Sequence, residues 1–350
     1  MKTFVILSLL TLVGTCATPK YSTKIKTLKD SIKLTDSALV IKYANTITAN
    51  ELKLQLYQFC SVEFKGRKVG EPGQKKAALF LKQFYQEQNI ASPLGSNQYF
   101  QTVPSDFMGN KYNSSENVLA YIKGSEKPEE VVIVSAHLDH LGLSENGKIY
   151  HGADDDGSGN VALMEMAQAF KKAQEQGCGP KRSVMFLHLT AEEAGLLGSK
   201  FYVKHPAFPL SKTLSNLNID MIGRVDPQQN STPNYIYLIG SDRLSKELHF
   251  LSEKVNNAYF NIHIDYRYNT ENEANNYYSR SDHYNFALKG IPVIFYFNGE
   301  HSDYHKTTDT PDKINFPLLE KRTKLIFATA WQIANQEHRL VTDRNNKLLK

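Results

Sequence analysis

The stretch VVIVSAHLDH (residues 131–140) decides the fold class. Its first six residues form a near-continuous apolar run, as in a strand that is buried on both faces, and polar residues follow at once. Four later stretches repeat the apolar run. They are SVMFLHLT (183–190), LSNLNIDMIG (214–223), YIYLIG (235–240) and IPVIFYF (291–297). Strands of this kind are typical of a mostly parallel sheet that is covered by helices.

The segments between these runs carry helical and mixed patterns. VALMEMAQAFKKAQEQ (161–176) and GQKKAALFLKQFYQEQNI (73–90) have apolar residues at helical spacing. Alternating, β-rich segments occur at NQYFQTVPS (97–105) and NVLAYIKG (117–124). The sequence therefore predicts an α/β domain with a central mixed, mostly parallel sheet.

Composition sets limits on the class of protein. The chain has 350 residues, of which 41% are hydrophobic and 22% are charged, as is ordinary for a folded globular protein. The formal charge of +5 arises from 41 basic and 36 acidic residues, and no block of basic residues stands out along the chain. We therefore expect no nucleic-acid partner.

The first residues, MKTFVILSLLTLVGTCATPK, have the pattern of an export signal. An apolar run from Phe4 to Val13 follows a basic start and is too short to span a bilayer. We predict a signal peptide over residues 1–17. LVGTC is also a loose lipobox, so either Cys16 becomes a lipid-anchored N-terminus or cleavage occurs near Ala17. Both routes predict an exported bacterial protein, in the periplasm, on the outer membrane as a lipoprotein, or outside the cell.

The rest of the chain is expected to form a single domain. Residues 18–345 contain no repeat, low-complexity tract or long linker, and an N-terminal helical extension is expected to precede the sheet. Cys60 and Cys178 can form a disulfide or remain free thiols, and the sequence leaves both possibilities open.

Polar residues gather where the buried runs end. HLDH follows VVIVSA, AEEAG (191–195) follows SVMFLHLT, and HSDYHKTTD (301–309) comes shortly after IPVIFYF. Because ligands of open α/β sheets bind beyond the carboxyl ends of the strands, we expect these side chains to share one site. The candidate residues are His137, Asp139, Asp155, Glu192, Glu193, Asp220 and His305.

This set of side chains predicts a metal centre. Imidazole and carboxylate groups without cysteine are a typical ligand set for a catalytic zinc. The surplus of acids indicates two ions, because the four positive charges of two Zn²⁺ balance three ligand carboxylates and one bridging hydroxide. GADDDGSGN (152–160) fits this interpretation, since its three adjacent aspartates repel one another unless a cation lies near them.

Five motifs in order carry a family resemblance. HLDHLG, GADDDGSGN, TAEEAGLLGS, NIDMIGR and DYHKTTDT together resemble the secreted co-catalytic zinc aminopeptidases of peptidase clan MH, which also includes glutamate carboxypeptidase. The resemblance covers roughly residues 65–335. It implies a three-layer αβα fold, two zinc ions per chain and hydrolysis of the N-terminal bond of peptide substrates. It also implies a zinc peptidase domain without an inserted protease-associated domain, for which residues 91–130 leave no room.

The resemblance assigns the metal ligands. His137 and Glu193 would hold one zinc, Asp220 and His305 would hold the other, and Asp155 would bridge the two. It also implies a cis peptide bond after Asp155.

Other residues of the motifs have different expected roles. The resemblance implies that Glu192 is the general base, which takes a proton from the attacking water and returns it to the leaving amine. Asp139 is expected to orient the imidazole of His137, which lies two residues before it. The resemblance also places Tyr304 near the oxyanion of the reaction.

Several residues near the motifs have expected structural roles. Asp154 and Asp156 are expected to bond amides of their own turn. In YSRSDHYNF, Ser281 or Asp282 is expected to cap a helix, in preference to a catalytic role for His283.

Alternative functions remain open at this stage. A carboxypeptidase or dipeptidase of the same clan would need an arginine for a terminal carboxylate, and Arg224 and Arg280 are candidates. The full ligand set disfavours a single-zinc glutaminyl cyclase, and the base Glu192 disfavours a non-catalytic metal-binding envelope protein. His140 and His151 can either line the substrate pocket or be structural.

Overall fold

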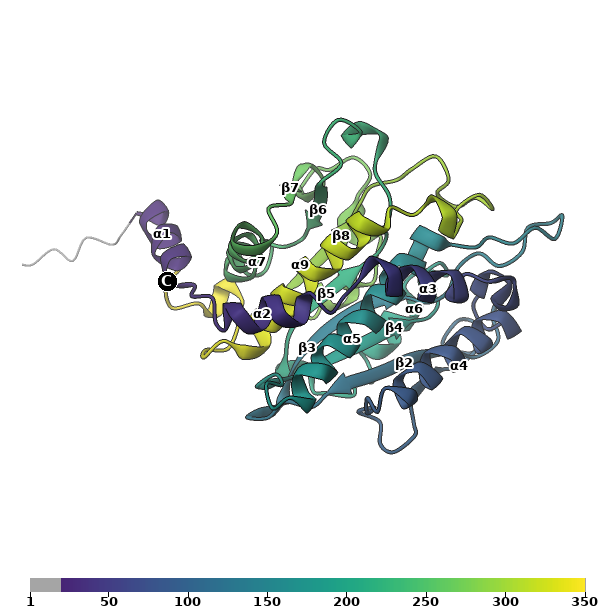
Figure 1. Ribbon diagram of the computed structural model, residues 1–350, viewed down its shortest axis with the longest axis horizontal. Helices are drawn as coiled ribbons and strands as arrows, with labels where there is room; N and C mark the ends of the chain where they lie inside the picture. The colour runs from purple at the N-terminus through teal and green to yellow at the C-terminus, as the bar shows by residue number, and fades with distance from the viewer. Residues whose placement is uncertain (1–19, 350) are drawn as a thin grey trace, which may run out of the picture.

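A mixed eight-stranded sheet forms the centre of the protein in a computed structural model that describes residues 20–349 (Figure 1). Its strands are β1 (Phe100–Val103), β2 (Ser115–Ile122), β3 (Lys127–His137), β4 (Arg182–Leu189), β5 (Thr213–Ile219), β6 (Tyr235–Ile239), β7 (His263–Asp265) and β8 (Val293–Phe297). They lie in the order β1-β2-β4-β3-β5-β8-β6-β7. The central strands β4, β3, β5 and β8 are parallel to one another, whereas β2 runs antiparallel to β4 and β6 runs antiparallel to β8.

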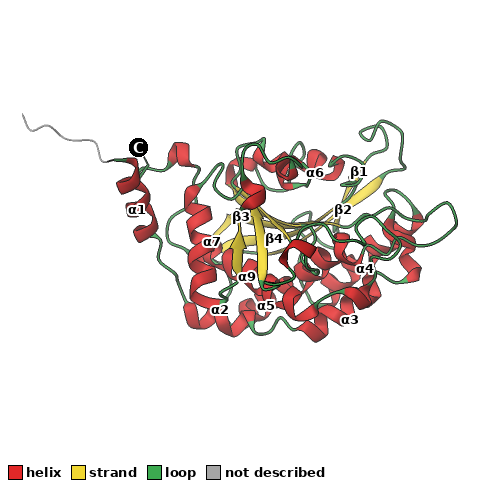
Figure 2. Ribbon diagram, turned by 90° about the horizontal axis from the view of Figure 1, so that it is seen from above, coloured by secondary structure: helices red, strands yellow, loops and turns green. Residues whose placement is uncertain are grey.

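Helices cover the two faces of the sheet unevenly (Figure 2). They are α1 (Tyr21–Ser31), α2 (Ser37–Ala44), α3 (Ala49–Phe59), α4 (Pro72–Glu87), α5 (Gly159–Glu175), α6 (Leu197–Tyr202), α7 (Lys246–Tyr259), α8 (His283–Ala287) and α9 (Phe316–Asn335). The long helices α3, α4, α5 and α9 lie on one face and the short helix α6 lies on the other, where α8 packs beside α6. This arrangement confirms the predicted three-layer αβα fold with a mixed, mostly parallel sheet.

The side chains of β3 show why the buried strands read as continuous apolar runs. Successive residues of a strand point to opposite faces of its sheet. Val132 and Val134 belong to the large apolar cluster beneath α5 and α9, whereas Val131 and Ile133 pack with Tyr202 of α6 on the other face. Both faces are therefore apolar, and the five predicted runs correspond to β3, β4, β5, β6 and β8. The three-residue strand β7 was not predicted.

The N-terminal part of the described chain is helical. Helices α2 and α3 pack on α5 and α9, on the face that carries the larger apolar cluster. The predicted signal peptide, residues 1–17 with Cys16, lies outside the described residues. Over residues 20–349, no helix has the length and apolar character needed to cross a membrane. Cys60 and Cys178 are both free thiols.

Candidate metal centre

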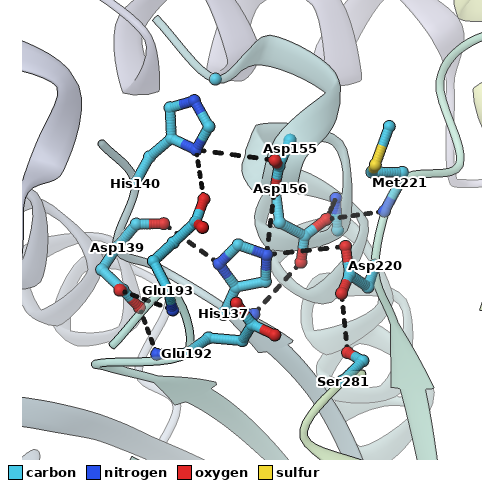
Figure 3. Close-up of polar contacts among 12 residues, drawn as sticks. His137, Asp139, His140, Asp155, Asp156, Glu192, Glu193, Asp220, Met221 and Ser281 are labelled. Carbon is cyan, nitrogen blue, oxygen red and sulfur yellow. Dashed lines mark hydrogen bonds and ion pairs between the residues drawn. The ribbon is translucent and has the colours of Figure 1, made fainter. Parts of the chain in front are cut away.

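Side chains from five segments meet beyond the carboxyl ends of the central strands, and Figure 3 shows His137, Asp155, Glu193 and Asp220 among them. β3 ends at His137, Asp220 directly follows β5, and Glu193 lies in the turn after β4. Asp155 lies in the loop that leads into α5, and His305 lies in the loop after β8. Because β3, β4, β5 and β8 are parallel, their carboxyl ends meet at one edge of the sheet, which brings these distant segments together.

The first group of candidate ligands consists of His137, Asp155 and Asp220 and is called the strand-side group. His137 Nε2 lies 3.1 Å from Asp155 Oδ1 and 3.5 Å from Asp220 Oδ1. Bonds of about 2.0–2.1 Å to a tetrahedral zinc place two ligand atoms roughly 3.3 Å apart. The three side chains are buried and therefore fit a metal ion between them without rearrangement.

The second group consists of Asp155, Glu193 and His305 and is called the loop-side group. His305 Nε2 lies 3.1 Å from Asp155 Oδ2 and 3.3 Å from Glu193 Oε2. His140 also reaches this group, with Nδ1 2.9 Å from Glu193 Oε1 and 3.7 Å from Asp155 Oδ2. These separations again match the ligand spacing around one ion.

The geometry corrects the predicted pairing of the ligands. His137 lies beside Asp220 rather than Glu193, and His305 lies beside Glu193 rather than Asp220. Asp155 turns one carboxylate oxygen toward each group, as a bridging ligand would. The error in the pairing arose because motif order along the chain does not say which strand ends are adjacent in space.

The third aspartate of GADDDGSGN ties the loop to two strand ends. The peptide bond between Asp155 and Asp156 is cis, as predicted. Asp156 accepts a hydrogen bond from the amide of Gly159 in its own turn, which fits the expected local role. It also accepts hydrogen bonds from the amides of His137 and Met221, at 3.1 and 3.2 Å, and so links the ends of β3 and β5.

The first aspartate has partners that are distant in the sequence, which corrects the expectation of a purely local role. Asp154 Oδ1 accepts a hydrogen bond of 2.6 Å from the amide of Gly223, and its Oδ2 lies 3.2 Å from His301 Nε2. The amides of Asp154 and Asp155 in turn donate to one oxygen of Asp309. The loop is thus held both through the side chain of Asp154 and through the backbone amides of Asp154 and Asp155.

Asp139 has a different role from the predicted one. The outer nitrogen of the His137 imidazole, Nδ1, lies 3.1 Å from the main-chain carbonyl oxygen of Asp139, not from its carboxylate. The carboxylate accepts hydrogen bonds from the amides of Glu192 and Glu193, at 3.0 and 3.3 Å. Since β3 ends at His137, Asp139 lies beyond the strand and does not share a strand face with His137. The main-chain carbonyl group of Asp139 therefore orients His137, and its carboxylate orients the turn that contains Glu192 and Glu193.

Glu192 lies half-buried beside the strand-side group. Its carboxylate accepts no hydrogen bond from any residue in the described range, although its amide is held by Asp139. Burial raises the pKa of Glu192 well above its usual value, and His137 opposes this whereas the negative charges of Asp220 and Asp282 add to it. A carboxylate that has a raised pKa and accepts no hydrogen bond is suited to accept a proton.

The sequence pattern of peptidase family M28 matches residues 117–330, more than half of the chain. The chain belongs to peptidase family M28. It is 33% identical over 198 residues to leupeptin-inactivating enzyme 1 of Streptomyces exfoliatus, covering 56% of this chain and 38% of that protein. It is 26% identical over 241 residues to probable aminopeptidase YDR415C of Saccharomyces cerevisiae, covering 67% of this chain and 61% of that protein. The chain thus spans less than two thirds of the length of these relatives.

Solved structures share the fold of this M28 chain. LapB from Legionella pneumophila has a TM-score of 0.69 at 22% identity, over 90% of this chain and 81% of that chain. BSAP, a zinc aminopeptidase from Bacillus subtilis, has a TM-score of 0.64 at 17% identity, over 87% of this chain and 99% of that chain. At these identities the similarity establishes the fold alone.

In the M28 chain, Ser281 supports a candidate ligand that the sequence did not connect to it. Ser281 Oγ donates a hydrogen bond of 2.7 Å to Asp220 Oδ2 and accepts one of 2.8 Å from Asn218. The predicted helix start is confirmed, since α8 begins at His283 with Asp282 at the N-cap position, but neither Ser281 nor Asp282 forms a side-chain capping hydrogen bond. Burial raises the pKa of Asp282 to about 7.

A buried series of hydrogen bonds links Tyr85, His188 and Asn160 to the backbone of the strand-side group. It is called the Tyr85–His188–Asn160 chain. Asn160 Nδ2 donates to the carbonyl oxygens of His137 and Asp156, at 2.6 and 2.7 Å. The amide oxygen of Asn160 must then accept from His188 Nδ1, at 2.7 Å, and His188 Nε2 accepts from the Tyr85 hydroxyl at 2.6 Å. Burial lowers the pKa of His188 to about 3, so its imidazole stays neutral.

Ion pairs anchor the loop that carries His305. Arg224 Nη2 lies 2.9 Å from Asp303 Oδ2, and Lys313 Nζ lies 2.6 Å from Asp303 Oδ1. Burial opposes ionisation of Asp303, but hydrogen bonds from Lys313, Thr308 and Arg224 hold the pKa of its carboxyl below the usual value. Arg224 is therefore committed to the loop and is not free to clamp a substrate.

The remaining candidates lie next to this loop. The ring of Tyr304 stacks on that of His305, and burial raises the pKa of its hydroxyl, so it remains a proton donor at neutral pH. Arg280 lies 3.4 Å from the Tyr304 hydroxyl and forms an ion pair of 3.1 Å with Glu300. His151 Nδ1 contacts the carbonyl oxygen of Cys60 at 2.8 Å, which fits a structural role.

Proposed function

We propose that this chain is a zinc-dependent aminopeptidase with two zinc ions. The observation that carries the proposal is Asp155, whose two carboxylate oxygens face two separate groups of imidazole and carboxylate side chains. No cysteine belongs to either group, which fits catalytic rather than structural zinc. Membership of the M28 family and the names of the yeast relative and of BSAP support the same activity.

Each zinc would have its own set of ligands. His137, Asp155 and Asp220 would hold the strand-side zinc, and Asp155, Glu193 and His305 would hold the loop-side zinc. When bound, zinc lowers the pKa of a coordinated water and polarises a carbonyl group.

Protein groups supply the proton transfers in this proposal. Glu192 accepts a proton from the attacking water and returns it to the leaving amine, for which its free carboxylate and raised pKa are suited. The hydroxyl of Tyr304 donates a hydrogen bond toward the negative charge that develops on the carbonyl oxygen. The carboxylate of Asp139 accepts a hydrogen bond from the amide of Glu192 and so keeps the base in position.

The arginines favour an aminopeptidase over a carboxypeptidase. A carboxypeptidase needs an arginine for the terminal carboxylate of its substrate. Arg224 is paired with Asp303, and Arg280 is paired with Glu300. Both candidate clamps are therefore occupied by acidic side chains of the protein.

We also propose that the protein acts outside the cytoplasm on peptides. The support is the signal-like pattern of residues 1–17 and the loose lipobox at Cys16. Mass spectrometry of the mature N-terminus tests this, with an acylated Cys16 expected for a lipoprotein and an unmodified N-terminus near residue 18 for ordinary cleavage. An intact Met1 in the mature protein would contradict export.

A comparison of wild type with Glu192→Gln tests the proposed activity. Hydrolysis of amino-acid p-nitroanilides is expected to require zinc, to stop with a chelator, and to fall roughly 10²–10⁴-fold in kcat in the variant. Zinc content should remain at two per chain in both. Glu129→Gln, at a half-exposed glutamate outside the site, is the matched control and should keep full activity.

Two outcomes would overturn the proposal. One is a wild-type protein that binds two zinc ions but hydrolyses no free-amine substrate, which would favour a metal-binding protein without catalysis. The other is hydrolysis of N-acetylated peptides from their carboxyl end, which would identify a carboxypeptidase.

A further inference from the structure

His140 lies at the loop-side group although the predicted ligand set does not include it. It follows β3 by three residues and is 1% exposed. Its Nδ1 points at the carboxylates of Glu193 and Asp155, as Figure 3 shows. The ligand atoms of His140, Asp155 and Glu193 all lie within 4.8 Å of one another.

We propose that His140 is a fourth protein ligand of the loop-side metal and binds it through Nδ1. This inference rests on the proposed two-metal function. The complete loop-side set is then His140, Asp155, Glu193 and His305, with two imidazoles and two carboxylates.

An unpartnered oxygen supports a cation at this position. Asp155 Oδ2 is buried and accepts no hydrogen bond from the described residues, although it lies 3.1 Å from His305 Nε2 and 3.7 Å from His140 Nδ1. Burial of an unpartnered carboxylate oxygen is costly unless a charge compensates for it. A metal ion between the two imidazoles and this oxygen would supply that charge.

The backbone holds the His140 ring in the orientation that binding needs. Gly152 packs against the ring so closely that an added Cβ would lie 2.6 Å from His140 Cδ2. A side chain at residue 152 would therefore displace the imidazole. Glu193 Oε1, at 2.9 Å from Nδ1, holds the other side of the ring.

A fourth ligand would make the two metal positions unequal. The strand-side group offers three protein ligands, so a zinc held there keeps a position open, as in catalytic sites. Four protein ligands on the loop side would fill a tetrahedral zinc. A second imidazole also favours zinc over magnesium or manganese, which prefer oxygen ligands.

Three variants test the proposal through metal binding instead of activity. His140→Ser removes the ligand. His140→Asn keeps an N–H group that can donate to Glu193 but cannot replace the imidazole as a ligand. His151→Ser removes a nearby histidine that contacts the carbonyl oxygen of Cys60, and serves as the control. Zinc titration of the metal-free proteins should show about 10–100-fold weaker binding of one of two ions in both His140 variants and no change in the control.

Proton NMR of the cobalt-substituted proteins counts the bound imidazoles directly. Wild type should show three solvent-exchangeable ring N–H signals shifted by Co²⁺, from His137, His305 and His140, and His140→Ser should show two. Thermal unfolding of the metal-free proteins checks that each variant is folded. Two signals in wild type, or a His140→Asn protein with wild-type zinc affinity, would overturn the proposal. Wild type that binds no second metal would instead refute the proposed two-metal function.

Discussion

The strand-side and loop-side groups share Asp155 but are built differently. The side chain of His137 is 1% exposed, and this residue lies at the end of β3. The side chain of His305 is 39% exposed, and this residue lies in a loop and has a positive φ of 55°. The strand-side group rests on parallel strands and on the Tyr85–His188–Asn160 chain. The loop-side group depends on ion pairs of Asp303 with Arg224 and Lys313.

One site can thus combine a rigidly held group of ligands with a group that moves more easily. A ligand at a strand end is positioned by the core of the sheet, and its movement would disturb many buried contacts. A ligand on an exposed loop is positioned by a few polar contacts and can open more easily. We therefore expect a chelator to remove zinc in two phases, with the loop-side ion leaving first.

Arg224→Met is expected to have the largest effect on the difference between the strand-side and loop-side groups. Its guanidinium lies 2.9 Å from Asp303 and 3.8 Å from Asp309, so its loss leaves Lys313 as the remaining basic partner of Asp303 and removes the arginine partner of the buried Asp309. The loop-side zinc should bind about 10–100-fold more weakly, because a group that orients a ligand is lost. Titration against a fluorescent chelator measures both affinities.

Arg267→Met is the control for this measurement. Arg267 also pairs with an aspartate, Asp265, at 2.7 Å, but lies beside β7 and away from the candidate ligands. It should leave both zinc affinities unchanged. Equal weakening of both ions by Arg224→Met would show that the two groups are not held independently.

The second largest effect is expected in the pH dependence of the free energy of unfolding, through His188, which supports the strand-side group. Burial lowers the pKa of His188 to about 3 in the folded protein, below its value in the unfolded chain. The contribution of neutral His188 to stability is therefore complete above about pH 6.5 and is lost as the pH falls toward 3. The free energy of unfolding of wild type, relative to His188→Asn, should drop by at most about 1.4 kcal/mol per pH unit over this window.

Urea unfolding of both metal-free proteins between pH 7 and pH 4 measures this slope. The absence of metal keeps ligand protonation from dominating the difference. A difference in stability that is constant across these pH values would mean that His188 is not held neutral.

The smallest effect is expected from Tyr85→Phe, which removes the first donor of the buried chain. Loss of this hydrogen bond should lower the free energy of unfolding by about 1 kcal/mol. Tyr99→Phe is the matched control, because its buried hydroxyl donates to the carbonyl oxygen of Ile90 at 2.6 Å and not toward the ligands. Only Tyr85→Phe should speed the slow, strand-side phase of zinc release. Identical release from both variants would show that the chain does not support His137.

Much of the fold could be predicted because burial on both faces leaves a strong pattern. β3, β4, β6 and β8 each present apolar residues to both faces of the sheet, and the sequence shows this directly. β7 carries no such pattern, since its three residues, His263–Asp265, are partly or fully exposed. Its position beside β6 follows from tertiary pairing, which short segments do not encode.

The site could be predicted as a set of residues but not as an arrangement. The motifs supplied the residues that meet around Asp155, because carboxyl ends of parallel strands share an edge. The pairing of His137 with Asp220 depends on which strands are neighbours, and β5 lies beside β3 in a way that motif order does not reveal. Ser281 was misread because its local sequence fits a helix start, whereas its partner Asp220 is distant in the chain.

The most direct measurement is a crystal structure of the zinc-loaded protein with anomalous diffraction collected at the zinc edge. We predict two anomalous peaks about 3.5–4 Å apart on either side of Asp155. One peak should lie within bonding distance of His137 and Asp220, and the other within bonding distance of Glu193 and His305. A single peak, or a second peak that Asp155 does not contact, would contradict the proposal of a shared two-metal centre.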